Sequence, residues 1–171
     1  DFIDLSQADV MLHLSDPSFD AATFEIWGAL THGATLVIAP TTQELTSQAL
    51  EQVITDNGLT VLWLTKTLFD NLYLQQPTMF ASLNYLLVGG EALNPDLIGQ
   101  LVSQKARPTH ILNGYGPTES TTFTTTYECE AFAHSVPLGK PISTRKVYVL
   151  NEQGQLSGIG VPGELYIGGA G

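Results

Sequence analysis

The sequence predicts an α/β protein: a mostly parallel sheet of βαβ units over about residues 8–118, followed by a smaller antiparallel β-rich region. Two patterns support this fold class. Short, continuously apolar runs rich in Val, Ile and Leu recur at nearly constant spacing, as expected for strands buried on both faces. The segments between them carry apolar residues at helical spacing. Strands that alternate with helices form parallel sheets.

The expected strands are VMLHL (10–14), ATLVIA (34–39), LTVLWLT (59–65), NYLLVGG (84–90) and THILNG (109–114). In the first expected helix, Phe24, Trp27 and Leu30 form an apolar stripe, and Gly33 offers a C-terminal stop. Further apolar stripes predict helices around 49–54, 68–72 and 97–101. Right-handed crossovers are the default for such units.

The pattern changes after Glu119, where TTFTTTYE alternates threonine with aromatic residues, and KVYVL and ELYIGG follow. These segments predict short antiparallel strands packed as a partial barrel or sandwich. We therefore divide the chain into an α/β core over 1–118 and a β-rich continuation of the same domain over 119–171. No low-complexity linker separates the two parts, so we expect them to pack together.

Composition excludes several classes of partner. The 171 residues include 6 basic and 17 acidic side chains, giving a net charge of −11, which argues against a nucleic-acid groove or an anionic membrane surface. No apolar run approaches the roughly 20 residues of a membrane span. The single Cys129 rules out an internal disulfide and suits a reducing compartment, so we expect a cytoplasmic protein. Only 13% of residues are charged, which suggests that part of the surface is normally covered.

Ligands of open α/β sheets bind beyond the carboxyl ends of the strands. That rule selects five stretches: Ser15–Asp20, Pro40–Thr42, Thr65–Lys66, Gly89–Ala92 and Asn113–Glu119. The last, NGYGPTES, could stack a purine on Tyr115, hold its edge through Asn113 and bring Glu119 to Mg²⁺. The alternative is an ordinary tight turn with a solvated glutamate.

Other motifs do not indicate a site. GIGVPG (158–163) matches the dinucleotide pattern G-x-G-x-x-G, but a strand follows it instead of a helix, so we interpret it as turn glycines. The histidines and the cysteine lack metal-binding spacing. His13 lies in an apolar strand, where a core histidine is expected. Ser15 and Ser18 lack the context of a hydrolase nucleophile.

Five segments in order, SFDAATFEIWGAL, LLVGGEAL, NGYGPTESTT, VPLGKPI and GELYIGGAG, resemble adenylation domains of nonribosomal peptide synthetases. These domains belong to the adenylate-forming superfamily with acyl-CoA synthetases and firefly luciferase. The resemblance runs through essentially the whole chain. It implies an internal piece of the large N-terminal domain, incomplete at both ends, with the lysine-bearing phosphate loop before Asp1 and the ribose-binding aspartate after Gly171. Such a piece is expected to be inactive in isolation.

The resemblance implies an ATP-dependent ligase of the kind used in antibiotic biosynthesis. The carboxylate of an amino acid attacks the α-phosphate of ATP, and an aminoacyl-adenylate and pyrophosphate form. The acyl group then passes to the phosphopantetheine thiol of a carrier protein, beside neighbouring synthetase domains. In this comparison Tyr115 stacks on adenine, Asn113 contacts its amino group, Thr118 approaches the phosphate and Glu119 holds Mg²⁺. The backbone that flanks the base belongs to Gly89, Gly90, Glu91 and Ala92.

Asp20 matches the aspartate that pairs with the substrate's α-amino group, although an N-cap for the helix that begins at Ala21 is the alternative. The positions that match the pocket wall are Ala21, Phe24, Trp63, Leu87, Gly89, Gly114, Thr122 and Phe123, each of which could equally be core. This set carries no charge besides that of Asp20 and resembles family pockets for valine. Isoleucine, one methylene larger, is expected to leak in.

Two other functions stay open at this point. The first is activation of a carboxylic acid without an amino group, as in acyl-CoA synthetases, although a buried Asp20 carboxylate facing an acyl chain would be penalised. The second is a non-catalytic fragment that retains only nucleotide binding or interaction. The intact Thr118 and Glu119 argue against such decay.

Overall fold

The computed structural model describes residues 2–39, 46–130 and 134–170, so the predicted Pro40–Thr42 stretch lies outside the described residues. Its main element is a seven-stranded sheet with the order β2-β1-β3-β4-β5-β6-β7. Five strands are parallel: β1 (Val10–His13), β2 (Thr35–Ile38), β3 (Val61–Thr65), β4 (Tyr85–Gly89) and β5 (His110–Tyr115). All five predicted strands are therefore confirmed, with ends shifted by one or two residues.

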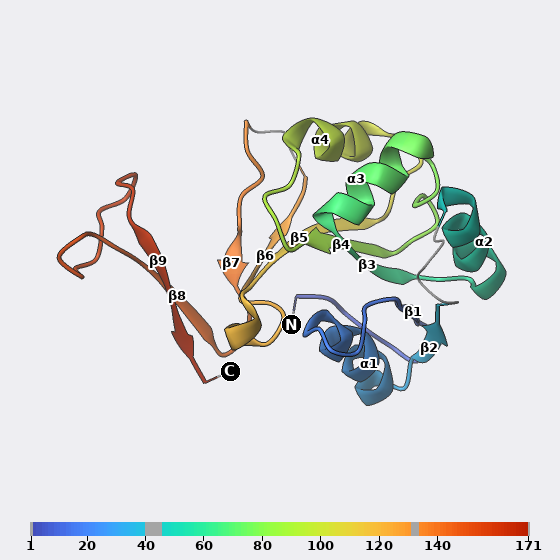
Figure 1. Ribbon diagram of the computed structural model, residues 1–171, viewed down its shortest axis with the longest axis horizontal. Coiled ribbons are helices and arrows are strands. Elements are labelled where there is room, and N and C mark those ends of the chain that lie inside the picture. The colour runs from blue at the N-terminus through green and yellow to red at the C-terminus, as the bar shows by residue number, and fades with distance from the viewer. Residues whose placement is uncertain (1, 40–45, 131–133, 171) are drawn as a thin grey trace.

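Helices cover both faces of this sheet. The helices are α1 (Ala21–His32), α2 (Ser47–Asn57), α3 (Lys66–Gln75) and α4 (Pro95–Ser103). Helix α1 lies on one face, and α2, α3 and α4 lie together on the other (Figure 1). Side chains of Thr46, Thr65 and Asn94 cap the last three helices, as their residue types predict. Among the described residues, no helix combines the length and apolar character that crossing a membrane requires.

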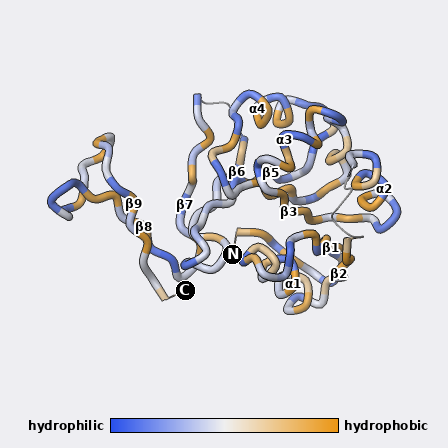
Figure 2. The backbone as a smooth tube through the Cα atoms, viewed as in Figure 1, coloured by the Kyte–Doolittle hydropathy of each residue, from blue (hydrophilic) through white to orange (hydrophobic). Residues whose placement is uncertain are grey.

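The core has two parts because successive strand residues point to opposite faces. Along β3, Leu62 and Leu64 belong to the cluster beneath α2, α3 and α4, whereas Val61 and Trp63 belong to the cluster on the α1 face. Hydrophobic residues accordingly follow the interior strands, while the outer turns of α2 are hydrophilic (Figure 2). The continuous apolar runs reflect this burial on both sides.

The predicted apolar stripe of α1 is wrong in two of its three positions. Trp27 and Leu30 are 59% and 56% exposed. The face that packs on the sheet instead carries Ala22, Glu25 and Ala29. Small residues allow α1 to approach the sheet closely: a Cβ atom at Gly28 would lie 3.2 Å from Met11 Cε. Trp27 and Leu30 are therefore turned outward, whereas Phe24 packs against the sheet.

The C-terminal region differs from the expected barrel or sandwich. Strands β6 (Thr125–Glu128) and β7 (Lys140–Pro141) run antiparallel and extend the main sheet from the edge of β5. Strands β8 (Arg145–Leu150) and β9 (Glu164–Gly169) form a separate two-stranded ribbon that projects from the body (Figure 1). GIGVPG lies in the β8–β9 connection, which confirms its interpretation as turn glycines.

Candidate functional site

A cavity of about 400 Å³ lies at the carboxyl ends of β4 and β5. Its lining combines residues 90–93 after β4 with residues 113–117 at the end of β5, and adds Val136 and Leu138 from the segment before β7. Two of the five predicted stretches therefore meet in one cavity. Sequence reasoning did not assign Val136 and Leu138 to it, although both belong to the VPLGKPI segment.

Asn113 presents the amide and Tyr115 the aromatic ring that NGYGPTES predicted. Tyr115 is half-buried and lines the cavity. Asn113 is buried, and its Nδ2 donates a hydrogen bond to the Pro137 carbonyl oxygen at 2.8 Å. This bond uses one of the two N–H donors of the amide and fixes its orientation, so Asn113 Oδ1 stays available as an acceptor for a ligand.

Gly89 and Gly114 are required by close packing at the strand ends. A Cβ atom at Gly89 would overlap the Gly114 carbonyl oxygen, and one at Gly114 would lie 2.6 Å from Cε1 of Phe123. Both contacts would be closer than van der Waals separation. A side chain at Gly89 would therefore push the neighbouring strand away, and one at Gly114 would push the Phe123 ring away. These two positions hold glycine for a reason independent of any ligand.

Thr118 and Glu119 are exposed on a 3₁₀ turn that spans Thr118–Ser120, directly after the cavity loop. Over the described residues, Glu119 takes part in no ion pair, and no cluster of three or more His, Cys, Asp or Glu side chains is present. One free carboxylate fits Mg²⁺, which protein sites hold through one or two carboxylates plus water and substrate phosphates.

Asp20 occupies the N-cap position of α1, but its side chain makes no capping hydrogen bond. The residue is half-buried, and its carboxylate has no hydrogen-bond or ion-pair partner within the described ranges. Its main-chain carbonyl accepts a hydrogen bond from Thr122 Oγ1 at 2.7 Å. The capping alternative is therefore not adopted, and the carboxylate is left available.

An aromatic cluster lies beside Asp20 on the α1 face of the sheet. Phe123 makes edge-to-face contacts with Phe24 and Trp63, with ring centroids 5.3 and 5.1 Å apart. Leu87 is buried in the same cluster. Phe2 joins it at 5.5 Å from Phe123, a contact that no sequence pattern indicated. An open hollow of about 270 Å³ is lined in part by Phe2, Phe24, Thr122 and Phe123.

Trp63 carries a polar group without a partner among the described residues of this wall. The side chain is 7% exposed, and its indole N–H has no hydrogen-bond partner within the described part of the chain. Ala21 and Thr122 are half-buried around the same cluster. Phe24, Trp63, Leu87 and Phe123 thus form one cluster on the face opposite α2, α3 and α4, with Ala21 packed against it. Gly89 lies against Trp63, Gly114 lies against Phe123, and Thr122 is bonded to Asp20.

Glu25 is a functional candidate that sequence reasoning missed. The carboxylate is 1% exposed, yet it accepts hydrogen bonds from the backbone N–H groups of Leu14 and Ser15 and from Ser15 Oγ, at 2.8–3.2 Å. His13 Nδ1 lies 2.7 Å from Glu25 Oε2. Glu25 therefore fixes the start of the loop that leads to Asp20. Nothing in the sequence distinguishes it from an exposed helix glutamate.

The remaining predicted residues have structural partners. Ser18 Oγ donates to Asp16 Oδ1 at 2.7 Å, and Ser15 is engaged with Glu25, so neither serine is poised as a nucleophile. Thr65 caps α3. Lys66 pairs with Asp70 at 2.9 Å and with no group of the cavity at ion-pair distance among the described residues.

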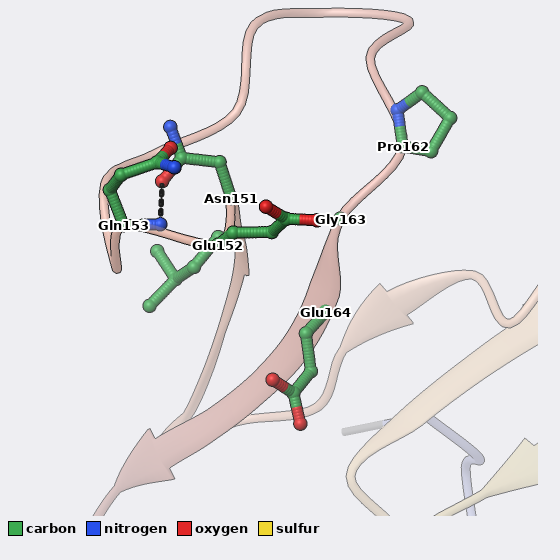
Figure 3. A pocket seen from close by; sticks show the side chains of 7 residues that line it. Asn151, Glu152, Gln153, Pro162, Gly163 and Glu164 are labelled. Carbon is green, nitrogen blue, oxygen red and sulfur yellow. Dashed lines mark hydrogen bonds between the residues drawn. The ribbon is translucent and has the colours of Figure 1, made fainter.

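A further hollow of about 430 Å³ lies on the projecting ribbon, between residues 150–153 and 162–164. Figure 3 shows the Glu152 and Glu164 carboxylates there and the hydrogen bond from Gln153 N to Asn151 Oδ1, which is 3.0 Å long. The hollow is remote from the carboxyl ends of the parallel strands. Two solvent-facing carboxylates do not make a ligand site, so the chemistry is assigned to the sheet edge.

An open, mostly parallel sheet with helices on both faces and a glycine-lined cavity at the carboxyl ends of its strands defines an α/β protein with a ligand-binding site at that edge. The family model described as AMP-binding enzyme matches residues 1–171. The chain belongs to this AMP-binding enzyme family, which confirms the predicted resemblance and fold class.

Its relatives are adenylation domains of nonribosomal peptide synthetases. The chain is 44% identical to tyrocidine synthase 3 of Brevibacillus parabrevis and 37% identical to surfactin synthase subunit 2 of Bacillus subtilis (strain 168), over 99% of its length in both cases. It spans only 3% and 5% of those two proteins.

Solved structures agree with the sequence relatives. Holo-PA1221, a nonribosomal peptide synthetase protein containing adenylation and PCP domains, matches with a TM-score of 0.91 and 36% identity, over 100% of this chain and 30% of that one. The Klebsiella oxytoca NpsA N-terminal subdomain, in complex with 3-hydroxybenzoyl-AMSN, matches with a TM-score of 0.86 and 34% identity. That match covers 96% of this chain and 41% of the other.

Proposed function

We propose that this chain is part of an adenylation domain that activates an amino acid with ATP and forms an aminoacyl-AMP. The observation that carries the proposal is the free carboxylate of Asp20, which stands at a helix N-cap without capping the helix. A half-buried carboxylate beside an apolar wall suits a substrate with an ammonium group next to an apolar side chain. An acyl chain without an amino group would leave that carboxylate unpaired.

The substrate we propose is valine or a similar branched aliphatic amino acid. Phe24, Trp63, Leu87 and Phe123 present no charge, so a charged substrate side chain would be buried without a partner there. The bulk of the three rings leaves room for a modest side chain. The other wall positions are Ala21, Gly89, Gly114 and Thr122.

ATP is proposed to occupy the cavity at β4 and β5. Tyr115 would stack on the base, and Asn113 Oδ1 would accept from its amino group. Backbone at 89–92 would flank the ring. Thr118 would approach the phosphate and Glu119 would hold Mg²⁺, which neutralises phosphate charge when bound. The substrate carboxylate then attacks the α-phosphorus and pyrophosphate leaves, so the residues of this chain act through positioning and electrostatics.

The proposed acceptor of the acyl group is the phosphopantetheine thiol of a carrier domain in a synthetase. Support comes from the solved relative that contains both adenylation and PCP domains. We also propose a cytoplasmic location. The lone Cys129 is buried without a disulfide, and burial raises the pKa of its thiol to about 12.

The test is amino-acid-dependent exchange of pyrophosphate into ATP by the full-length protein. Valine is expected to support exchange, and Asp20→Asn is expected to remove most of it. Asp56→Asn, on the exposed side of α2, is the matched control and should exchange like wild type. A folded protein that exchanges with no amino acid would contradict the proposal. Exchange with a desamino acid that Asp20→Asn leaves unchanged would favour the carboxylic-acid alternative.

A further inference from the structure

The segment 120–123 joins the two halves of the candidate site. It begins at the end of the turn that carries Thr118 and Glu119, and it ends at Phe123 in the aromatic cluster. Within this segment, the Thr122 hydroxyl donates a hydrogen bond to the main-chain carbonyl of Asp20, 102 positions earlier in the chain. We propose that Thr122 is a positioning residue: it fixes the main chain of Asp20 and so holds its carboxylate for the substrate ammonium group. This inference rests on the proposed amino-acid-activating function.

The first observation is the set of bonds on the Asp20 carbonyl. It accepts from Thr122 Oγ1 at 2.7 Å and from the Thr23 backbone N–H, in the first turn of α1, at 2.9 Å. Two donors fill both lone pairs of a carbonyl oxygen. The main chain of Asp20 is therefore restrained from both sides, while its side chain makes no capping bond. This is the arrangement expected for a carboxylate that is held in place for a ligand.

The second observation is local backbone strain. Thr121 and Thr122 have φ angles of +52° and +70°, which β-branched residues rarely adopt. Such conformations persist only where the surroundings impose them, and they gather at functional sites. Here Ser120 O accepts from Arg145 Nη2, and Thr124 N donates to Tyr115 O at 2.7 Å. The strained pair is thus held at both ends, so the Thr122 hydroxyl has a fixed direction.

The third observation connects Thr122 to the cavity at β4 and β5. A Cβ atom at Gly116 would lie 2.5 Å from the Thr122 carbonyl oxygen, so the cavity loop rests directly on the Thr122 backbone. The main chain of Thr122 contacts the proposed nucleotide loop, while its hydroxyl holds Asp20. One residue therefore sets the distance between the ammonium-binding carboxylate and the nucleotide. In-line attack on the α-phosphorus depends on that distance.

The test separates this role from simple wall packing. Thr122→Val keeps the shape and apolar contacts of the side chain but loses the donor, whereas Thr122→Ser keeps the donor. In the full-length protein, we expect Thr122→Val to raise the valine KM in pyrophosphate exchange about 5- to 20-fold and to change the ATP KM by less than twofold. Thr122→Ser should return the valine KM to within about threefold of wild type. Thr55→Val, which removes a 2.9 Å hydroxyl-to-carbonyl bond to Glu51 on α2, is the matched control.

A double-mutant cycle tests whether Thr122 acts through Asp20. In the Asp20→Asn background, Thr122→Val is expected to change the valine KM by less than twofold, because its effect is already lost. Equal effects of Thr122→Val in both backgrounds would overturn the proposal. An unchanged valine KM in Thr122→Val, or a Thr122→Ser variant as impaired as Thr122→Val, would also overturn it.

Hydrogen–deuterium exchange supplies a measurement that needs no turnover. The backbone amides at the start of α1 should exchange at least fivefold faster in Thr122→Val than in wild type, Thr122→Ser or Thr55→Val. Unchanged exchange at that position would overturn the proposal even if no amino acid supports pyrophosphate exchange. Failure of the proposed function and failure of this inference are therefore observed separately. Thr122→Ala gives a second donor-free variant for the same comparison.

Discussion

The buried side-chain amide of Asn113 donates its hydrogen bond to the Pro137 carbonyl oxygen, 2.8 Å away. Asn113→Asp replaces that donor with a carboxylate oxygen that faces the carbonyl. We expect the ATP KM in pyrophosphate exchange to rise at least tenfold. The buried carboxylate would be repelled by the Pro137 carbonyl oxygen, and the side chain at 113 would no longer be held with its acceptor oxygen toward the cavity. The amino-acid KM should change little. The measurement is exchange at varied ATP and saturating amino acid.

Asn57→Asp is the matched control for this change. Asn57 Nδ2 donates to the Val53 carbonyl at 2.9 Å on the exposed surface of α2, so the same substitution breaks the same kind of bond away from the cavity. Its ATP KM should equal that of wild type. A wild-type ATP KM in Asn113→Asp would show that the Pro137 contact does not orient the amide for nucleotide binding.

Glu25→Gln tests the buried carboxylate beneath the Asp20 loop. The new amide nitrogen cannot accept from Leu14 N, Ser15 N or Ser15 Oγ, so at least one buried donor loses its partner. We expect a loss of about 1–3 kcal/mol in the free energy of unfolding. Cys129, the single cysteine of the chain, is buried, and its raised thiol pKa of about 12 suppresses alkylation in the native state.

Urea-dependent alkylation of Cys129, followed by peptide mass spectrometry, therefore reports unfolding of this region within the full-length protein. The urea midpoint should fall for Glu25→Gln. For Glu152→Gln, which is exposed, the free energy of unfolding should stay within about 0.5 kcal/mol of wild type. Equal midpoints for wild type and Glu25→Gln would mean that the loop does not depend on this carboxylate.

Sequence patterns predicted the parts of this fold that are determined locally. Strands such as 61–65 and 85–89 are buried on both faces, so continuous apolar runs identified them. The stripe through Trp27 and Leu30 was misassigned because helical spacing cannot show that small residues face the sheet. NGYGPTES identified the cavity loop because its residue types are unusual at a strand end.

The missed features share a different cause. Glu25 is buried only because four donors on another segment converge on it, and local sequence carries no sign of them. The bond from Thr122 to Asp20 joins residues 102 positions apart. The hydrogen bond from Asn113 to Pro137 likewise depends on β6 pairing with β5 and on the segment that leads into β7, which pairs with β6. These contacts are set by tertiary geometry, which residue spacing does not encode.

Gly114→Ala tests the packing between β5 and the aromatic cluster. The added Cβ would lie 2.6 Å from Phe123 Cε1, so the ring must shift within its contacts to Phe24 and Trp63. Overpacking of this kind costs about 1–3 kcal/mol, and we expect the Cys129 alkylation midpoint to fall accordingly. Gly168→Ala on β9 is the control, because its nearest atom, Tyr148 Cε2, lies 4.0 Å away. A wild-type alkylation midpoint in both variants would show that the Phe123 ring can move without loss of stability, contrary to this prediction.

Asp9 links the stability of the sheet to pH. Burial alone raises the pKa of its carboxyl, but hydrogen bonds from Thr60 Oγ1 and from the backbone N–H and Oγ of Ser6 outweigh it and leave the pKa below its ordinary value. The native state therefore binds this proton less tightly than the unfolded chain. The stabilisation is complete above about pH 5 and is lost as pH falls through the lowered native pKa.

Asp9→Asn should remove this contribution. We expect a lower Cys129 alkylation midpoint than wild type at pH 7 and a smaller further loss between about pH 5 and pH 3, because the asparagine has no proton to gain. Urea midpoints across that range, read at each pH by a short pulse of an acid-active protease and peptide mass spectrometry, provide the measurement. Asp56→Asn, at an exposed position on α2, should keep the wild-type dependence. If the stability of Asp9→Asn falls as steeply with acid as that of wild type, the prediction is wrong and other carboxylates cause the acid sensitivity.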